Sequence, residues 1–391
     1  MDRRHPELRT YSESSYRYNS EDEDEEGTKP SKHFVLDILV FSVNYGVNSR
    51  GFEITHTCGD QDIFVCFGGG YITEVIPEYD VVIFAGDILN DRNWDYLTEQ
   101  REPRQVWIFA SDVNPLKSTY ILPPEGMPGT EFNMSFTYHS KSELHYSYGK
   151  YYPYTENGTI SNTTDLFDED EFDKKLVTWD SVDCFNGSWD RVKFVDELSK
   201  HIPVDIYGDC GNLKCRGNNS FHRKSPGSGG CQKVLNKYKF VLSLEDGCCS
   251  ELLSNHFWNV LYHHKSVPVV VGASKEDYQR FAPPNSFIFA GDFKTVQELA
   301  NYLLEVSSNR LKYNAFFEWQ EMGSVKLTNR KEQQIHHKDH FCSILTYLDE
   351  NYSKEQVMRT RVDPYGPMWR GGCDQCRQYD ILKKYFDGQL S

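Results

Sequence analysis

The stretch 238–272 constrains the fold more than any other part of this 391-residue chain. Residues 240–244 form a short apolar run that predicts a buried strand, and the turn signal Glu245-Asp246-Gly247 follows it. Apolar residues then recur at helical spacing over 251–264, and 267–272 predicts a second buried strand. Strand, loop, helix and strand make a βαβ unit, whose strands are normally parallel. Loops at the carboxyl ends of such strands are where α/β domains hold phosphorylated ligands.

Runs of strand character alternate with helical or mixed segments along the rest of the chain. The expected strands lie at 34–41, 62–67, 81–84, 105–110, 176–179, 204–207 and 286–289. The expected helices lie at 189–201, 296–307 and 330–351, and the last of these is a candidate to cross back to the first half of the chain. This alternation is typical of an α/β fold with doubly wound sheets.

Changes in composition divide the chain into four expected parts. Residues 1–33 are polar and strongly acidic, so we expect a disordered tail. The first α/β domain is expected over 34–172, and it ends in a polar, acidic linker over 151–173. The second domain is expected over 173–340, and a C-terminal helix and Cys-x-x-Cys tail occupy 341–391.

The net charge and the cysteine content limit the kinds of partner and the cellular compartment that fit this chain. A net charge of −16 argues against a nucleic-acid surface, which needs a basic stripe. Eleven cysteines together with Asn-x-Ser/Thr sequons favour an oxidising, glycosylating compartment. The glycosylation candidates are Asn133, Asn157, Asn162, Asn186, Asn218 and Asn351. The chain contains no signal peptide and no apolar run of the roughly 20 residues needed to span a bilayer.

Some patterns leave two interpretations open. Cys58 and Cys66 are candidates for a local disulfide, and two buried free thiols are the alternative. The pair Cys373 and Cys376 could be half of a zinc site, but the only other half on offer, Cys210 and Cys215, is a poor match in spacing. The acidic run 168–170 matches the Asp-x-Asp metal signature, but it lacks the apolar strand that would hold the carboxylates rigidly, so no metal site is expected.

Several motifs in order resemble the α-1,3-fucosyltransferases, which are glycosyltransferase family 10. The family's donor motif runs Phe-Glu-Asn-Ser, four variable positions, Tyr-Ile/Val-Thr-Glu-Lys, a helix and Val-Pro-Val-Val-x-Gly. Glu245 matches its first Glu and 267–270 its closing strand, and the similarity continues through 278–319. The Thr-Glu-Lys core is Ser254-Asn255-His256 in this chain. Cys373-x-x-Cys376 resembles the family's terminal Cys-x-x-Cys, which is a disulfide element there.

The resemblance also implies a fold and donor-side roles. It implies two Rossmann-like domains facing each other across a cleft, the GT-B architecture, with the donor bound by the second domain. Arg191 matches the family's phosphate-binding Arg, and a guanidinium in the first turn of a helix suits a pyrophosphate. The further donor-binding candidates are Tyr207, Asp246, Asn255 and His256.

The catalytic and acceptor-side candidates depend on the same resemblance. Glu245 is one catalytic candidate. The family's presumed general base falls on Val113, which cannot take a proton, so Asp112 is the other candidate. His139 replaces an Arg on the acceptor side, and without the resemblance it would be expected at the surface.

The implied reaction moves L-fucose from GDP-β-L-fucose to the 3-hydroxyl, or 4-hydroxyl, of N-acetylglucosamine with inversion and no obligatory metal or other cofactor. The implied acceptor is a glycan on a glycoprotein or glycolipid, and the implied place is the Golgi lumen, where family members are mostly anchored as type II membrane proteins. The altered Thr-Glu-Lys core supports an alternative, a fucosyltransferase-like protein that binds nucleotide or glycan without turnover.

Overall fold

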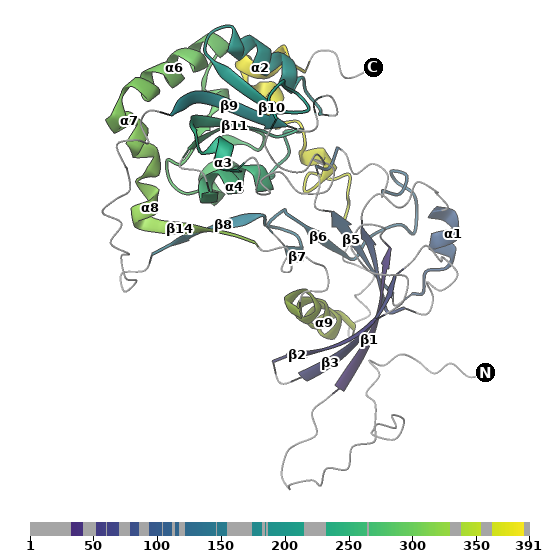
Figure 1. The fold of residues 1–391 in the computed structure, drawn as a ribbon. Helices are drawn as coiled ribbons and strands as arrows, with labels where there is room; N and C mark the ends of the chain where they lie inside the picture. The colour runs from purple at the N-terminus through teal and green to yellow at the C-terminus, as the bar shows by residue number, and fades with distance from the viewer. Residues whose placement is uncertain are drawn as a thin grey trace, which may run out of the picture.

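The computed structural model contains two parallel-rich sheets and a short two-stranded ribbon that lies between them (Figure 1). The structure describes residues 33–41, 52–59, 61–69, 79–85, 94–103, 105–111, 114–116, 122–145, 147–154, 174–181, 184, 187–214, 232–263, 266–328, 338–352 and 362–386. Among them, no helix is long and apolar enough to cross a membrane.

The first sheet has seven strands in the spatial order β2-β3-β1-β4-β5-β6-β7. Their bounds are β1 His33–Phe41, β2 Phe52–Cys58, β3 Gln61–Gly69, β4 Val81–Ala85, β5 Val106–Ser111, β6 Met134–Thr137 and β7 Leu144–His145. Every neighbouring pair is parallel except β2 and β3, which form an antiparallel pair at one edge. The aromatic side chains of Trp107, Phe109 and Phe132 form its core together with Trp94 of α1, Trp94–Glu99.

The β2–β3 pairing explains why the expected local disulfide is wrong. Cys58 lies opposite Gln61 at the turn end of the pair, whereas Cys66 lies opposite Glu53, several residues away along the ladder. Cys58 is bonded instead to Cys342 in the helix α9, Lys338–Tyr352. That helix also packs its His340 ring against Phe136 of β6, so the chain does return to the first sheet after leaving the second (Figure 1).

The second sheet is entirely parallel, in the order β10-β9-β11-β12-β13. Its strands are β9 Lys175–Ser181, β10 Val204–Gly208, β11 Tyr238–Leu244, β12 Val267–Val271 and β13 Ile288–Phe289. The helices that accompany it are α2 Arg191–Ser199, α3 Gln232–Leu235, α4 Asn255–His263, α5 Lys275–Phe281, α6 Val296–Ser308, α7 Arg310–Asn314, α8 Trp319–Met322 and α10 Asp380–Lys383. The parallel pairing of β11 with β12 confirms the predicted βαβ unit.

The helix of that unit begins later than predicted, at Asn255 rather than at residue 251. Cys248 and Cys249 are bonded to Cys376 and Cys373, and Glu251 has a left-handed backbone with φ of 59°. Both constraints prevent a helical turn before residue 255, so the apolar side chains that precede it are buried from a loop. The C-terminal Cys-x-x-Cys is therefore a disulfide element.

The zinc interpretation of the Cys-x-x-Cys tail is wrong. Both of its cysteines are bonded to the loop after β11, and Cys210 is bonded to Cys184.

The expected linker over 151–173 begins as a strand. β8, Gly149–Pro153, pairs antiparallel with β14, Gly323–Leu327, and the two form the ribbon between the sheets. Tyr151 and Val325 face inward and pack in one apolar cluster with Trp258 and Trp319. The first part of the predicted linker is thus an ordered bridge, and 155–173 lies outside the described residues.

Candidate functional site

The carboxyl edge of the second sheet gathers several of the residues predicted from the sequence. Asp190 caps α2 by accepting a hydrogen bond from the Lys193 backbone N–H, which places Arg191 in the first helical turn. Arg191 is buried, and its guanidinium lies 3.4 Å from the Leu244 carbonyl at the end of β11. The Trp189 indole donates to the next carbonyl, that of Glu245, at 2.9 Å. The start of α2 is thus fastened to the end of β11.

Glu245 is a buried carboxyl beneath the loop that follows β11. Its Oε1 accepts a hydrogen bond from the Ser254 backbone N–H at 3.3 Å, just before α4 begins. Gly272 leaves room for it, because a Cβ there would lie 2.4 Å from the Glu245 Cγ. Burial raises the pKa of Glu245 to about 7, so this carboxyl can change its protonation state near neutral pH.

His256 stands in the first turn of α4 and forms a partly buried ion pair with Asp180 of β9. The distance between Nε2 and the Asp180 Oδ1 is 2.7 Å, and Nδ1 lies 3.3 Å from the Ser243 hydroxyl. Burial by itself would lower the pKa of His256, but the Asp180 charge and hydrogen bond outweigh it, with help from Glu245, and the pKa is raised. The imidazole is therefore held toward its cationic form, in place of the lysine of the family motif.

The other donor-side candidates lie around this edge in different surroundings. Asn255 accepts two hydrogen bonds from the Asn259 side chain, through its carbonyl and its Oδ1. The Tyr207 hydroxyl, on the edge strand β10, lies 3.1 Å from the Tyr238 hydroxyl. The Asp246 Oδ1 accepts a hydrogen bond from the Asn114 side-chain amide, in the loop after β5 of the first sheet, at 2.8 Å. The sequence could not predict this last contact, which spans 132 residues.

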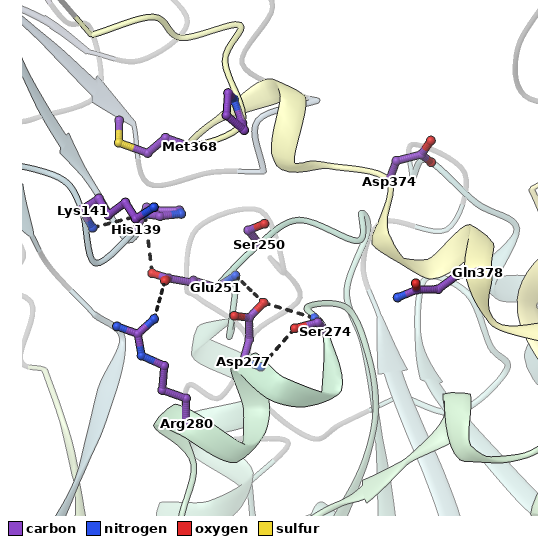
Figure 2. Close-up of a pocket in the computed structure, with 11 residues that line it drawn as sticks. His139, Lys141, Ser250, Glu251, Ser274, Asp277, Arg280, Met368, Asp374 and Gln378 are labelled. Carbon is purple, nitrogen blue, oxygen red and sulfur yellow. Dashed lines mark hydrogen bonds and ion pairs between the residues drawn. The ribbon is translucent and has the colours of Figure 1, made fainter.

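A cavity of ≈ 660 Å³ lies next to this edge, and Figure 2 shows its lining. It is bounded by the turn after β6, the loop after β11, α5 and the C-terminal segment. His139, Lys141, Ser250, Glu251, Asp277, Arg280, Met368 and Gln378 are among its lining residues. Because Glu245 and His256 are not among them, the cavity and the edge cluster are neighbouring but separate features.

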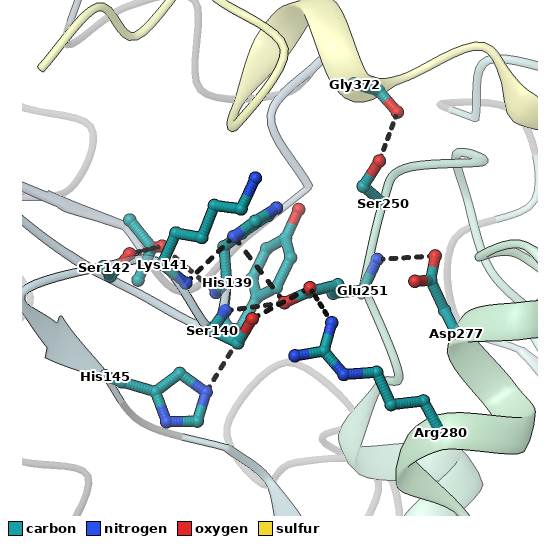
Figure 3. Close-up of polar contacts among 12 residues, drawn as sticks. His139, Ser140, Lys141, Ser142, His145, Ser250, Glu251, Asp277, Arg280 and Gly372 are labelled. Atoms are coloured by element: carbon teal, nitrogen blue, oxygen red, sulfur yellow. Dashed lines mark hydrogen bonds and ion pairs between the residues drawn. The ribbon is translucent and has the colours of Figure 1, made fainter.

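Glu251 joins the two sheets at the centre of this cavity (Figure 3). Its carboxylate accepts from the Ser140 backbone N–H at 2.6 Å and from the Ser140 hydroxyl at 2.9 Å, and Arg280 of α5 donates at 3.1 Å. Sequence reasoning missed this residue. Its partners are remote in the chain, and its left-handed backbone carries no signal in a non-glycine residue.

His139 lines the same cavity, and the expectation of a surface histidine is wrong because its ring is buried. Its Nδ1 accepts a hydrogen bond from the Lys141 backbone N–H at 3.2 Å. Burial lowers the pKa of His139 although the Glu251 carboxylate opposes the shift. A neutral imidazole that accepts at Nδ1 makes no ion pair with Glu251, which lies 3.6 Å away.

Of the remaining candidates, one is wrong, one lies in a helix, and several lie outside the described residues. Asn133 is buried, and its Oδ1 accepts from the Trp107 backbone and from Arg101, so an attached glycan would have no room. Asn351 lies in α9. Residues Asp112, Val113, Asn157, Asn162, Asn186, Asn218 and 168–170 lie outside the described ranges. Within those ranges, no group of three or more His, Cys, Asp or Glu side chains could hold a metal ion.

The fold and this edge cluster define an α/β protein with a polar site at the carboxyl ends of a parallel sheet. Residues 171–362 match the family model for the C-terminal part of glycosyltransferase family 10 (fucosyltransferase). The resemblance seen in the motifs is thereby confirmed for this segment.

Curated relatives fit this assignment. The chain is 28% identical over 255 residues to the 4-galactosyl-N-acetylglucosaminide 3-alpha-L-fucosyltransferase FUT5 of Gorilla gorilla gorilla, covering 64% of this chain and 61% of the relative. It is 27% identical over 249 residues to the FUT6 enzyme of Pan troglodytes, covering 63% of each. The chain thus spans about three-fifths of the length of these relatives. The match to a solved α1,3-fucosyltransferase covers 84% of this chain and 93% of the solved chain, at 14% identity and with a TM-score of 0.46. A match at this TM-score does not fix the architecture.

Proposed function

We propose that this protein is an inverting fucosyltransferase that moves L-fucose from GDP-β-L-fucose to the 3-hydroxyl, or 4-hydroxyl, of N-acetylglucosamine in a glycan. One observation carries the proposal. Within the segment that matches the family, Arg191 and His256 start two helices beside the end of β11. Fixed cations and helix N-termini at such an edge suit a pyrophosphate. The two sheets would be the cores of two domains of the GT-B type, divided near residue 173.

The chemistry assigns different work to the two sides of the site. As the bond between the fucose C1 and the GDP oxygen breaks, Arg191 would offset the charge that develops on GDP, with His256 and the N-terminus of α4 in support. We propose that Tyr207, Asp246 and Asn255 complete the donor site. Preorganised donors of this kind commonly contribute about 100- to 1,000-fold in rate.

The acceptor hydroxyl attacks C1 from the opposite face and must lose its proton. We propose Asp112 as the base that takes this proton, since Val113 cannot. Glu245, whose pKa is about 7, is too deeply buried to meet the acceptor directly in the described geometry. We propose that its charge stabilises the oxocarbenium-like state of the fucose ring from below the loop.

The cavity beside the edge would hold the acceptor, because it lies where the first sheet's turn meets the loop after β11. Its lining of hydroxyl, amide, ammonium and carboxylate groups suits a hydroxyl-rich sugar, with His139 on the acceptor side. We further propose that the protein works in the Golgi lumen, since its described disulfides need an oxidising compartment. Asn157, Asn162, Asn186, Asn218 and Asn351 remain its proposed glycosylation sites.

The test is transfer from GDP-fucose to N-acetyllactosamine and to N-glycans, with the linkage of the product read by NMR. We expect an α-linked product that Arg191→Ala and Glu245→Ala abolish and that a chelator leaves unchanged. Tight GDP binding without any transfer would instead support the binding protein that the Ser254-Asn255-His256 core raises as an alternative.

A further inference from the structure

Tyr278 of α5 places a buried hydroxyl beside Glu245. A capping box at Ser274 closes the first turn of α5, and the Tyr278 side chain is fully buried. The centroid of its ring lies 5.2 Å from that of Phe257 and 5.3 Å from that of Phe287. The capped helix and the two phenylalanine rings together fix the position of the hydroxyl.

Gly272, at the end of β12, shows how near this hydroxyl lies to the Glu245 side chain. An ideal Cβ at Gly272 would lie 2.9 Å from the Tyr278 hydroxyl oxygen and 2.4 Å from the Glu245 Cγ. Both groups therefore border the same space, which a glycine leaves open. Because the carboxylate oxygens lie two bonds beyond the Cγ, a rotation of the Glu245 side chain can bring one of them within hydrogen-bond reach of the hydroxyl.

The Tyr278 hydroxyl is an unused donor. It is buried, and it has no hydrogen-bond partner within the described part of the chain. A buried polar group without a partner costs free energy, and a phenylalanine would fill the same space without that cost. The hydroxyl therefore indicates a partner that it meets in another state of the site.

The ionised Glu245 carboxylate is the partner that the geometry offers. The Ser254 backbone N–H donates to its Oε1 over 3.3 Å, which is long for a hydrogen bond and competes weakly with a closer donor. Burial, with the charges of Glu245 and Asp277 in addition, raises the pKa of Tyr278, so the hydroxyl keeps its proton and can donate it to an anion. A hydrogen bond to an ionised group is stronger than one between neutral groups.

Other ionisable groups face Glu245 from the neighbouring elements. Burial raises the pKa of Glu245 most, Asp246 of the same loop raises it further, and His256 of α4 lowers it. Arg191 of α2 lies 3.4 Å from the carbonyl at the end of β11. Tyr138, in the turn after β6, has its pKa raised first by burial and also by Glu245. Because burial dominates, Glu245 needs a further donor to be fully ionised at neutral pH.

We propose that Tyr278 is a positioning residue that donates a hydrogen bond to the ionised Glu245 carboxylate and holds it beneath the fucose ring while positive charge develops there. The proposal deepens the proposed function, and it rests on the role of Glu245 in that function. Tyr278 touches neither the donor nor the acceptor, since it is fully buried. Ionisation of Glu245, with its proton passing to the solvent, closes the hydrogen bond.

The experiment follows the titration of Glu245 by NMR, on the full chain with glutamate labelled at its carboxyl carbon and without GDP-fucose. The Glu245 signal is the one that Glu245→Gln removes. Tyr278→Phe deletes only the hydroxyl. The control, Tyr385→Phe, deletes another buried hydroxyl without a partner in the described part of the chain, one that lies near Asp190 and Glu197 instead. We expect Tyr278→Phe to move the Glu245 midpoint upward by about one pH unit and the control to leave it in place.

Fucose transfer gives a second readout. If Glu245 acts as an anion, kcat falls below its midpoint, and Tyr278→Phe should lower kcat about tenfold at pH 6 while the KM for the acceptor stays the same. Thermal unfolding at pH 5 should show both tyrosine variants at least as stable as the wild type, because each loses an unpaired buried hydroxyl.

The two readouts separate this proposal from the proposed function. An unchanged or lowered Glu245 midpoint in Tyr278→Phe, or an equal rise in the control, would overturn the role of Tyr278. A pH profile of kcat that stays in place while the midpoint moves would also overturn it. If no transfer is detected and the midpoint rises in Tyr278→Phe alone, the proposed function fails, whereas the hydrogen bond from Tyr278 to Glu245 stands.

Discussion

The two sides of the site are built in different ways. On the proposed donor side, Arg191 comes from the β9–α2 junction, and Glu245 and His256 come from the β11–α4 junction. The two strands are neighbours in one parallel sheet, and the positions of these residues follow from local sequence pattern. On the cavity side, Glu251 of the loop after β11 meets Ser140 of the turn after β6 across 111 residues, and Arg280 of α5 donates to the same carboxylate. The comparison teaches that the donor side depends on secondary structure, whereas the cavity side depends on contacts that only the complete fold creates.

The largest effect should come from the two disulfides that bind the loop after β11 to the C-terminal segment. They span 128 and 124 residues and close nearly the same loop, so either one alone keeps most of the entropic constraint on the unfolded chain. Replacing both Cys248 and Cys376 by Ser should therefore lower the free energy of unfolding only a little. Replacing all four cysteines should lower it by about 4 kcal/mol. Denaturant unfolding measures this, and equal, additive losses for the two pairs would contradict it.

A second prediction concerns the proposed donor side, where the buried Glu245 should make the stability of the fold depend on pH. Because the pKa of Glu245 is raised from 4.5 to about 7, the folded state binds this proton more tightly than the unfolded state. Stability should then fall as pH rises from about 4.5 to 7, by roughly 3 kcal/mol in total. Glu245→Gln removes that loss, so the variant should gain on the wild type between pH 5 and pH 8 in denaturant unfolding. Parallel pH profiles would show that the carboxyl is not held protonated.

The cavity side can be tested with a matched pair of carboxylates. Glu143 accepts from the backbone N–H and the hydroxyl of Ser135, as Glu251 does from Ser140, but Glu143 does so within one sheet. Glu251→Gln should cost about 2 kcal/mol because hydrogen bonds to a buried charge are lost. It should also speed amide exchange at Ser140, whereas Glu143→Gln should not. Slow exchange at Ser140 in both variants would mean that Glu251 does not join the sheets.

The smallest expected effect concerns His256 and Asp180. The pKa of His256 is raised in the folded protein. The ion pair therefore stabilises the fold below about pH 6.5, and this stabilisation is lost as the pH rises through the pKa that His256 has in the folded state. Asp180→Asn should cost about 1 kcal/mol at pH 6 and little at pH 9. NMR titration of the imidazole should show a lower pKa in the variant. An unchanged titration midpoint would rule out Asp180 as the group that holds the charge.

The sequence predicted the parts of the molecule that depend on short segments. The strands at 240–244 and 267–271, the helix expected over 189–201 that forms as α2, and the parallel βαβ unit follow from apolar spacing. The β2–β3 pair and the ribbon were missed, because each is defined by which strand becomes its neighbour. The partners of Cys58 and Glu251 were missed for the same reason, since chain distance hides contacts that tertiary packing makes.

Calorimetry with GDP tests the central claim most directly, because the nucleotide could lie either at the edge of the second sheet or in the cavity. Arg191 stands at the edge, and Arg280, which is largely exposed, stands in the cavity. We expect the wild-type protein to bind GDP. Arg191→Ala should weaken this binding by about 100-fold or more, because the guanidinium is buried, and Arg280→Ala should change it less than about threefold, because that guanidinium is exposed. Thermal unfolding of each variant confirms that it is folded. Binding that survives Arg191→Ala and is lost with Arg280→Ala would place the nucleotide in the cavity and contradict the account.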